Sequence, residues 1–300
     1  MTLTSESPNW AGVGADALLD LAESRLRELE RRWSRFLPDS DITRANHAAG
    51  SPVTVHRDTL EVVARAVEAW KQTGGLFDAT VLPALLHHGY TTSRAPGSAS
   101  GRPTLAPLVT AQRIGVTGGI LVDRERNMLT VPAGGAIDLG GIGKGYAADC
   151  VSAELIRAGA SGAMVDIGGD LALRGLPTFG ERWIVGVEDP TNPPHLITSV
   201  ALVVGGVATS GTTVRRWMSP AGETVHHLID PATAKPSTTS ILTATVLASD
   251  ASTAEAFATA AMMHDGPGAV EMLEATGLAG IVITRDGTPL RTRSLRAFAP

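Results

Sequence analysis

The sequence has little of several features that mark large classes of protein. It contains one cysteine, Cys150, in 300 residues, so no internal disulfide can form. Charged residues make up 18% of the chain and the net charge is −5, which gives no electrostatic reason to expect nucleic acid or an anionic membrane as a partner. Hydrophobic residues make up 43%, which is typical of a globular protein with an ample core.

The sequence also lacks segments that would direct it to a membrane. Its first residues, Met-Thr-Leu-Thr-Ser-Glu-Ser-Pro, contain neither a basic region nor the apolar stretch of a secretory signal. No apolar run is long enough to cross a bilayer. We therefore expect a cytoplasmic protein without a membrane span, or an envelope protein if a signal peptide has been removed.

The most informative stretch is a glycine-rich loop at residues 138–149, Asp-Leu-Gly-Gly-Ile-Gly-Lys-Gly-Tyr-Ala-Ala-Asp. A helix that begins after such a loop presents free N–H groups, which suits a phosphate. Gly145 stands where a Walker loop needs Ser or Thr, and Tyr146 stands where the Rossmann pattern needs Gly. The loop is therefore either a phosphate site of a less common kind or a plain turn before a core helix.

Four further segments occur with this loop in a fixed order. They are residues 34–46 (Ser-Arg-Phe through Asn), 73–83 (Thr-Gly-Gly-Leu-Phe-Asp-Ala-Thr-Val-Leu-Pro), 165–170 (Val-Asp-Ile-Gly-Gly-Asp) and 208–259, which holds Ala-Thr-Ser-Gly, His-His-Leu-Ile-Asp-Pro and Ala-Glu-Ala-Phe-Ala-Thr. Each motif is weak by itself. As an ordered set of five, they resemble the ApbE family, the FAD:protein FMN transferases, from about residue 30 to the C-terminus.

The hydrophobic pattern and the resemblance favour the same fold. Helices and strands mix without strict alternation, so we predict an α+β fold: a single ApbE-like domain at 14–300 with mixed sheets and flanking helices, after an N-terminal tail at 1–13. Residues 91–104 read as a flexible loop. The pattern has no counterpart of the first strand of the family, so we expect that strand to be missing or degraded. The predicted helices span 14–36, 58–71 (capped by Asp58), 146–158, 252–264 and 268–276, and the predicted strands 163–167, 182–188, 199–204, 241–248 and 279–284.

The resemblance implies a reaction in which FMN passes from FAD to a Thr or Ser hydroxyl of an acceptor protein and AMP is released, with Mg²⁺ as cofactor. The acceptor would carry a motif like Asp-Gly-x-(Ser/Thr)-Gly-Ala-(Ser/Thr), which this chain lacks, so the protein is not expected to modify itself. Two alternatives remain open. One is a pyrophosphatase that splits FAD into FMN and AMP, and the other is a non-catalytic flavin-binding module.

The pair His226-His227 contains the candidate base that would accept the proton of the acceptor hydroxyl. Histidine suits this role because its ordinary pKa lies near 6.5. The resemblance places His227 at the catalytic position, and neighbouring side chains on a strand point to opposite faces, so only one of the two is expected to act. The alternative is that both are merely polar strand or turn residues.

The resemblance also implies a Mg²⁺ site made by Glu255, Thr259 and the carbonyl of Gly141. Glu255 departs from the family pattern, which has Asp. The spacing of four puts Glu255 and Thr259 on one helical face, and their oxygens suit a hard cation. In the competing interpretation Glu255 completes a capping box on the N–H of Ser252, and Thr259 bonds a backbone carbonyl one turn back.

The remaining positions are implied to bind FAD. Asp138 would face the nucleoside side, and Lys144 would lie by the diphosphate as a point charge. Asp138 could instead be an N-cap or turn residue of the loop, Lys144 a solvated lysine, and Phe77 a core residue. The other implied flavin- or nucleotide-binding residues are Leu76, Phe77, Asp78, Asp170, Thr209, Ser210 and Ile229.

Overall fold

The structure is a computed structural model, and it describes residues 2–4, 14–92 and 112–300. Within that part of the chain, no helix has the length and apolar character needed to cross a membrane. The chain divides into two compact units. Unit 1 comprises Met1–Glu28, Ile142–Gly211 and Thr239–Pro300, and unit 2 comprises Leu29–Gly141 and Thr212–Thr238.

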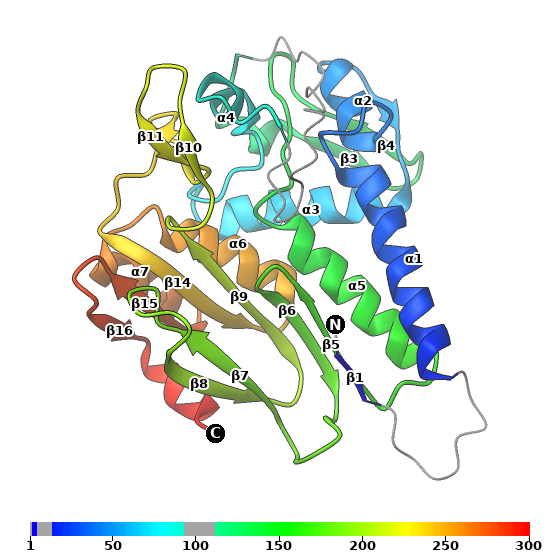
Figure 1. Cartoon of the computed structure of the whole chain (residues 1–300). Helices are drawn as coiled ribbons and strands as arrows, with labels where there is room; N and C mark the ends of the chain where they lie inside the picture. Colours follow the sequence, from blue (N-terminus) through cyan, green and yellow to red (C-terminus); the bar gives the residue numbers. More distant parts are fainter. Residues whose placement is uncertain (1, 5–13, 93–111) are drawn as a thin grey trace. The chain divides into compact units, whose positions relative to one another are not determined.

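Unit 1 is built on a seven-stranded sheet in which every neighbouring pair of strands is antiparallel (Figure 1). Its registers bring strands that are far apart in sequence together, so Asp170 lies opposite Ala208 and Thr209 opposite Thr245. In sheet order the strands are β1 (Thr2–Thr4), β5 (Gly162–Ile167), β6 (Asp170–Gly175), β9 (Gly205–Gly211), β14 (Ile241–Ala248), β15 (Ala279–Thr284) and β16 (Pro289–Arg291).

The two faces of this sheet carry different covers, because side chains alternate along each strand. One face packs against α5 (Gly143–Arg157), α6 (Ala251–Ala261) and α7 (Gly266–Ala275). The other packs against the hairpin of β7 (Trp183–Glu188) and β8 (Leu196–Leu202). The alternating burial of β7, whose Trp183, Val185 and Val187 are buried, is the signature of such a one-sided contact.

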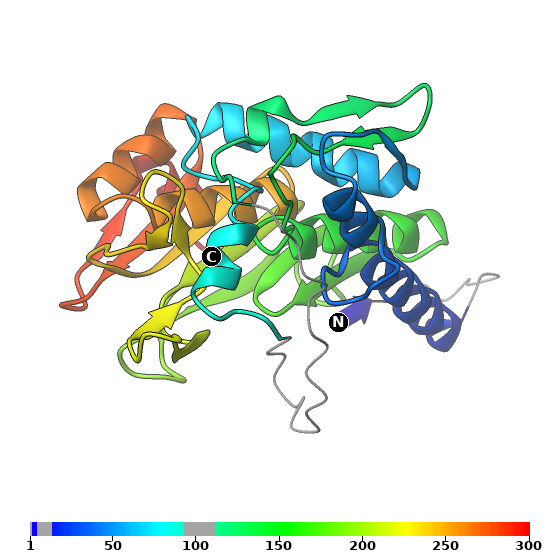
Figure 2. The ribbon, with the colours of Figure 1, turned by 90° about the horizontal axis from the view of Figure 1, so that it is seen from above.

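Unit 2 is made of short helices and three small sheets. Figure 2 shows the hairpin of β3 (Leu121–Asp123) and β4 (Met128–Thr130) alongside α3 (Arg57–Gln72). The apolar face of α3 supplies core residues of this unit, among them Leu60 and Val63. Its other elements are α2 (Asp41–His47), β2 (Val53–Thr54), α4 (Leu82–His87), the 3₁₀ turn η1 (Thr117–Gly119) and the strands β10 (Arg216–Met218), β11 (Thr224–His226), β12 (Ile229–Asp230) and β13 (Lys235–Pro236).

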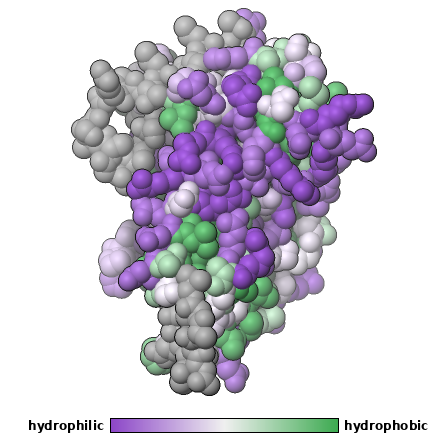
Figure 3. All heavy atoms as spheres, turned by 90° about the vertical axis from the view of Figure 1, so that its right-hand side faces the viewer, coloured by the Kyte–Doolittle hydropathy of each residue, from purple (hydrophilic) through white to green (hydrophobic). Residues whose placement is uncertain are grey.

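Helix α1 (Ala15–Trp33) carries a charged outer face. Figure 3 shows hydrophilic side chains predominating on the side of the molecule where α1 runs. Arg27 pairs with Glu23 one turn away, with Nη2 and Oε1 2.5 Å apart. Leu18 and Ala22 lie on the opposite, buried side of the helix. This division is the amphipathic pattern that predicted the helix from sequence.

The α+β prediction is confirmed, and two strands match their predicted bounds, β14 at 241–248 and β15 at 279–284. The first strand, expected to be missing or degraded, is present with only three residues. Thr2–Thr4 forms β1 and pairs with β5, with Thr2 opposite Met164. Three residues carry too short a pattern for detection, and the strand forms because β5 offers an unpaired edge. Most of the predicted loop 91–104 lies outside the described residues.

The start of α3 also differs from expectation. The N-cap is His56, whose Nδ1 accepts a hydrogen bond from the N–H of Asp58 at 3.2 Å. Asp58 itself lies in the first turn, where its carboxylate binds Arg32 at 2.7 Å. Asp58 was a reasonable capping residue by type, but the guanidinium of Arg32 from α1 competes for its carboxylate, and no local pattern reveals that partner.

Close packing of α5 against α6 generates a first prediction, for Gly145. A Cβ added there would lie 2.3 Å from the carbonyl oxygen of Ala251, which is backbone and cannot move aside alone. Gly145→Ala should therefore lower the free energy of unfolding by at least about 1–3 kcal/mol, despite the better helix propensity of alanine. Urea denaturation measures the change.

Gly14→Ala is the matched control, because its added Cβ meets nothing within 4 Å. It should stay within about 0.5 kcal/mol of the parent. Equal stabilities for Gly145→Ala and the parent would show that α5 and α6 are not in contact at this glycine.

Candidate functional site

The predicted site residues fall on both compact units, and each group is described within its own unit. Unit 1 carries Lys144, Asp170, Thr209, Ser210, Glu255 and Thr259. Unit 2 carries Leu76, Phe77, Asp78, Asp138, Gly141, His227 and Ile229.

Lys144, Asp170 and Glu255 form a buried charge cluster in unit 1. The Lys144 ammonium contacts Asp170 Oδ2 and lies 2.6 Å from Glu255 Oε1. Both acidic residues are only 2% exposed. Lys144 is the second residue of α5, Asp170 begins β6 and Glu255 lies on α6, so three elements meet here. Two carboxylates face one ammonium, so the three groups together carry a net charge of −1 when all are ionised.

Helices α5 and α6 cap each other through carboxylates. Glu255 Oε2 on α6 accepts a hydrogen bond from the N–H of Gly145 in the first turn of α5, at 2.8 Å. In return, Asp149 on α5 accepts from the N–H groups of Ala251 and Ser252 in the first turn of α6, at 2.8 and 2.9 Å. Each carboxylate satisfies donors that a helix start leaves unpaired. Sequence reasoning gave Asp149 no role, although it closes the glycine-rich motif.

Burial dominates the electrostatics of this cluster. Burial raises the pKa of Glu255, Lys144 opposes that rise, the charge of Asp170 adds to it, and the result is a pKa of about 7. Burial lowers the pKa of Lys144, but the charges of Glu255 and Asp170 outweigh it and raise that pKa overall. The pKa of Asp149 is also raised by burial, against the hydrogen bonds from Ala251 and Ser252. Unit 1 therefore holds a carboxyl group poised to gain a proton or a cation near neutral pH.

The capping-box interpretation of Glu255 is wrong. The N-cap of α6 is Asp250, whose carboxylate accepts from the N–H of Thr253 at 2.9 Å. The N–H of Ser252 is taken by Asp149, and Glu255 points instead to Lys144 and Gly145. The local Ser-x-x-Glu pattern is not used as a capping box, because Glu255 and the N–H of Ser252 each bind partners more than a hundred residues away in the sequence.

Two hydroxyl groups accompany this cluster in unit 1. The Ser210 hydroxyl on β9 lies 3.3 Å from the Thr259 hydroxyl on α6. Thr209 takes the other face of the strand, where its hydroxyl lies 2.9 Å from that of Thr245 on β14. The structure therefore brings Ser210 to the side of the sheet that carries Glu255 and Thr259, and it places Thr209 on the opposite face.

The oxygen atoms of the unit 1 cluster are of the chemical type that a hard divalent cation prefers as ligands. Glu255 and Thr259 offer a carboxylate and a hydroxyl, and the cluster carries a negative charge that such an ion would neutralise. Within the described ranges, no group of three or more His, Cys, Asp or Glu residues could hold a metal by itself. Mg²⁺ is usually bound by one or two carboxylates with substrate phosphates, so a sparse protein set is compatible with it.

In unit 2, Asp138 at the start of the glycine-rich loop is held on two sides. Its Oδ2 lies 2.6 Å from Arg35 Nε, and its Oδ1 accepts from the N–H of Gly140 at 2.6 Å. The preceding residue, Ile137, exchanges two backbone hydrogen bonds with the side chain of Asn46, at 2.7 and 2.9 Å. Sequence reasoning assigned no function to Arg35 or Asn46, although both lie in the early motif at 34–46.

Asp78 lies in a hydrogen-bonded turn of the same unit. Its Oδ1 accepts from the N–H of Thr80 at 2.6 Å and from the hydroxyl of Thr117 at 2.9 Å. Phe77 beside it is 2% exposed and belongs to the core, while Leu76 is half-buried. The N–H of Asp138 donates to the carbonyl of Ala79 at 2.8 Å, so the Asp78 turn and the glycine-rich loop are neighbours.

The two histidines at the end of β11 have different environments. His226 is buried, with Nε2 3.0 Å from the carbonyl of Ser237 and Nδ1 accepting from the N–H of Leu228 at 3.3 Å. Both ring nitrogens therefore serve the local turn. His227 is only half-buried. Ile229 packs in a core cluster with Ala84 and Leu85.

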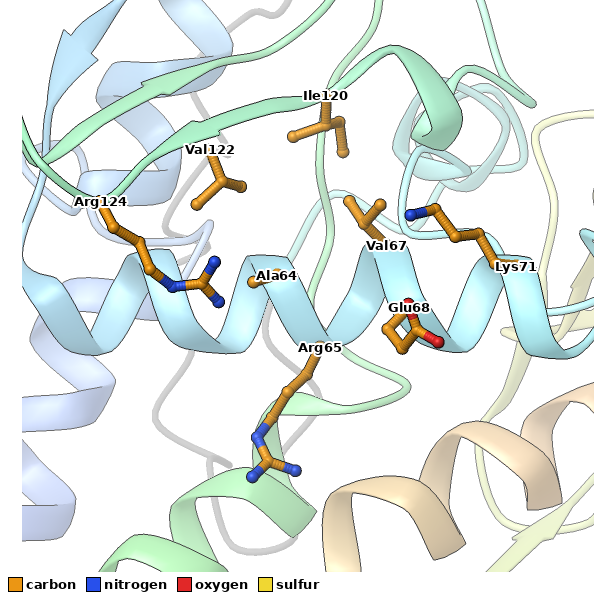
Figure 4. A pocket seen from close by; sticks show the side chains of 8 residues that line it. All are labelled: Ala64, Arg65, Val67, Glu68, Lys71, Ile120, Val122 and Arg124. Carbon is orange, nitrogen blue, oxygen red and sulfur yellow. The ribbon is translucent and has the colours of Figure 1, made fainter.

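Unit 2 also contains a hollow of about 410 Å³ beside α3 (Figure 4). Val67, Ile120 and Val122 form its apolar wall. Lys71 and Arg124 lie beside them, while the side chain of Arg65 extends toward the other side of α3. Arg124 is engaged with Glu61, with Nε and Oε1 2.8 Å apart. None of the predicted site residues lines this hollow, so it is separate from the candidate site.

The burial of Glu255 generates a prediction about pH. The pKa of its carboxyl is near 4.5 when unperturbed and about 7 in the fold, so between these values the folded state binds more protons than the unfolded state. The free energy of unfolding should therefore fall as pH rises from about 5 to about 7 in the presence of a chelator. Glu255→Gln should flatten this slope, as measured by urea denaturation at several pH values. An identical slope in both proteins would contradict the burial of an ionisable group at this position.

Comparison with known proteins bears on the family and the fold of this chain. The profile of the ApbE family matches residues 2–282. A protein of Klebsiella pneumoniae named FAD:protein FMN transferase is 28% identical over 286 residues, which cover 93% of this chain and 80% of that protein. A Haemophilus influenzae protein of the same name is 28% identical over 285 residues, which cover 92% of this chain and 81% of that protein.

Solved structures share the fold over nearly the whole chain. The crystal structure of the ApbE protein from Thermotoga maritima superposes with a TM-score of 0.83 at 25% identity, covering 97% of this chain and 93% of that one. The flavin transferase ApbE from Vibrio cholerae gives a TM-score of 0.77 at 25% identity, covering 98% and 93%. The profile match spans far more than half of the chain, and it shows that this protein belongs to the ApbE family.

Proposed function

We propose that this protein transfers FMN from FAD to a Ser or Thr hydroxyl of an acceptor protein and releases AMP, with Mg²⁺ as cofactor. The relatives named FAD:protein FMN transferase support the reaction class. The observation that carries the proposal is the buried Lys144–Asp170–Glu255 cluster at the start of α5, built from three of the family's motifs. Its carboxylate oxygens lie at the start of α5, in the glycine-rich loop for which the sequence predicts phosphate binding, and this supports the proposal of a cation site there.

The transfer exchanges one P–O bond for another. The acceptor hydroxyl oxygen attacks the phosphorus of the FMN half, the bond from that phosphorus to the oxygen bridging the AMP phosphate breaks, and AMP leaves. The hydroxyl proton passes to a base, for which we propose His227. His226 suits this role less, because both of its ring nitrogens are occupied by the turn. A positioned base contributes roughly 10²–10⁴-fold in rate.

Other residues are proposed to hold the substrate and the cation. Glu255, Thr259 and the carbonyl of Gly141 would hold Mg²⁺, which neutralises charge on the diphosphate when bound. Lys144 would balance the same charge from α5. Asp138 would bind the nucleoside side of FAD, and the remaining flavin- or nucleotide-binding positions are Leu76, Phe77, Asp78, Asp170, Thr209, Ser210 and Ile229.

The test of this function is direct. The protein is incubated with FAD, Mg²⁺ and a peptide that carries Asp-Gly-x-(Ser/Thr)-Gly-Ala-(Ser/Thr), and the products are analysed by mass spectrometry. We expect the peptide to gain the mass of FMN less water, with AMP released. FMN and AMP with an unmodified peptide would indicate a pyrophosphatase, and bound FAD without turnover would indicate a binding module.

The two histidines provide a further prediction. His227→Ala should leave FAD binding nearly intact and slow transfer by two or more orders of magnitude, because only the proton acceptor is lost. His226→Ala should act mainly through stability, since it removes two hydrogen bonds of a buried turn. Transfer rates at saturating FAD and thermal melting separate the two effects. A His227→Ala protein that transfers at the parental rate would remove this residue from the chemistry.

A further inference from the structure

Arg35 stands just beyond the end of α1, in unit 2, and its guanidinium is fixed from several directions. Nε lies 2.6 Å from Asp138 Oδ2, and Nη2 donates to the carbonyl of Tyr90 at 2.9 Å. The side chain is only 5% exposed. A buried guanidinium with this many fixed partners has one orientation, and it transmits that orientation to the carboxylate it binds.

Aromatic rings hold the same guanidinium from its faces. Its central carbon lies 4.1 Å from the ring centroid of Phe36 and 4.8 Å from that of Tyr90. Tyr90 is in turn stacked on Trp217, with centroids 5.0 Å apart, and Trp217 Nε1 donates to the carbonyl of His88 at 2.7 Å. These contacts make Arg35 part of a rigid support, because cation–π attraction is strongest where water is excluded.

Two buried polar atoms of this region lack a hydrogen-bond partner within the described part of the chain. They are Arg35 Nη1 and Asp78 Oδ2. Asp78 and Asp138 are linked through the hydrogen bond from the Asp138 N–H to Ala79. Buried donors and acceptors without partners are costly, so they are typically kept where a ligand or an ordered water completes them.

We propose that Arg35 is a positioning residue that fixes Asp138 for nucleotide selectivity. An ion-paired carboxylate accepts hydrogen bonds and donates none, so Asp138 recognises a donor on the ligand. The inference rests on the proposed binding of the nucleoside half of FAD by Asp138. That half offers two kinds of donor, the exocyclic amine of adenine and the ribose hydroxyls.

Arg35 acts on the nucleotide through Asp138, whose carboxylate it orients. Its loss frees the carboxylate to rotate and to be solvated, so the nucleotide loses a preorganised acceptor while the FMN half is unaffected. A group that only stabilised the fold would instead weaken both halves together or neither. The separation of AMP binding from FMN binding is therefore the diagnostic readout.

The test measures binding to the full-length protein by calorimetry, without any transfer step. The ligands are AMP, IMP (which has a carbonyl in place of the amine), 2′,3′-dideoxy-AMP and FMN. Arg35→Gln should weaken AMP roughly 10-fold or more, the range for a lost hydrogen bond to a charged group, and leave FMN unchanged. The parent should favour AMP over whichever analogue lacks the recognised donor, and the variant should lose that preference.

Companion variants keep the test decisive if Arg35→Gln folds poorly. Arg35→Lys keeps the charge but loses the planar fork, so it should restore AMP binding only in part. Asp138→Asn should reproduce the loss of preference. The double variant Arg35→Gln/Asp138→Asn should have an AMP affinity no lower than that of whichever single variant binds AMP less tightly. Arg44→Gln is the matched control, because Arg44 likewise bridges a carboxylate, that of Asp41, and the carbonyl of Thr54.

Three results would overturn the inference. The first is an Arg35→Gln protein that keeps the parental AMP affinity and preference and shows only a lower melting temperature. The others are an equal loss of affinity for AMP and FMN in Arg35→Gln, and additive losses of AMP affinity in the double variant. A parent that shows the predicted preference but never modifies a peptide would contradict the transferase proposal alone. A parent that modifies the peptide while Arg35→Gln keeps its AMP preference would contradict this inference alone.

Discussion

The structure of unit 1 depends on one reciprocal contact, in which the starts of α5 and α6 are each capped by a carboxylate from the other helix. Asp149 binds the N–H groups of Ala251 and Ser252, and Glu255 binds the N–H of Gly145. The contact requires close approach, and Gly145 allows it because any side chain would collide with the backbone of Ala251. This contact also positions Lys144 next to Asp170, which is the first residue of β6.

This contact changes the meaning of the glycine-rich loop. A free helix start after such a loop would bind a phosphate through its own N–H groups. Here a donor in the first turn of α5 is already taken by the carboxylate of Glu255. A diphosphate that approaches α5 meets the negative carboxylate of Glu255 as well as Lys144. A divalent cation between the diphosphate and this carboxylate would offset their repulsion. The glutamate that departs from the family pattern is thus central to the proposed dependence on Mg²⁺.

Sequence reasoning succeeded where structure follows from local pattern. The apolar runs at 241–248 and 279–284 predicted β14 and β15 because buried central strands are nearly continuous in aliphatic residues. It missed the strand at 205–211, Gly-Gly-Val-Ala-Thr-Ser-Gly, whose small residues give no strand signal. Those residues are small because α6 lies against them, so a Cβ on Gly206 would fall 2.3 Å from Ala251.

The site itself could be predicted only in part, because its residue types are local but its partners are not. The motifs singled out Asp138, Lys144 and Glu255 as candidates, and the structure brings Lys144 and Glu255 together. The capping box was wrong, since the partner of Glu255 lies 110 positions away in Gly145. Arg35, which holds Asp138 across more than a hundred residues, left no local signal beyond its place in a motif.

The central claim is that the oxygens of Glu255 and Thr259 form a cation site when FAD is bound. Anomalous diffraction from crystals of the protein with FAD and Mn²⁺, used as a detectable substitute for Mg²⁺, tests it most directly. The account predicts a manganese peak at a coordination distance of roughly 2 Å from both the Glu255 carboxylate and the Thr259 hydroxyl. A manganese ion bound to the FAD diphosphate but remote from Glu255, with Lys144 still paired to that carboxylate, would contradict it.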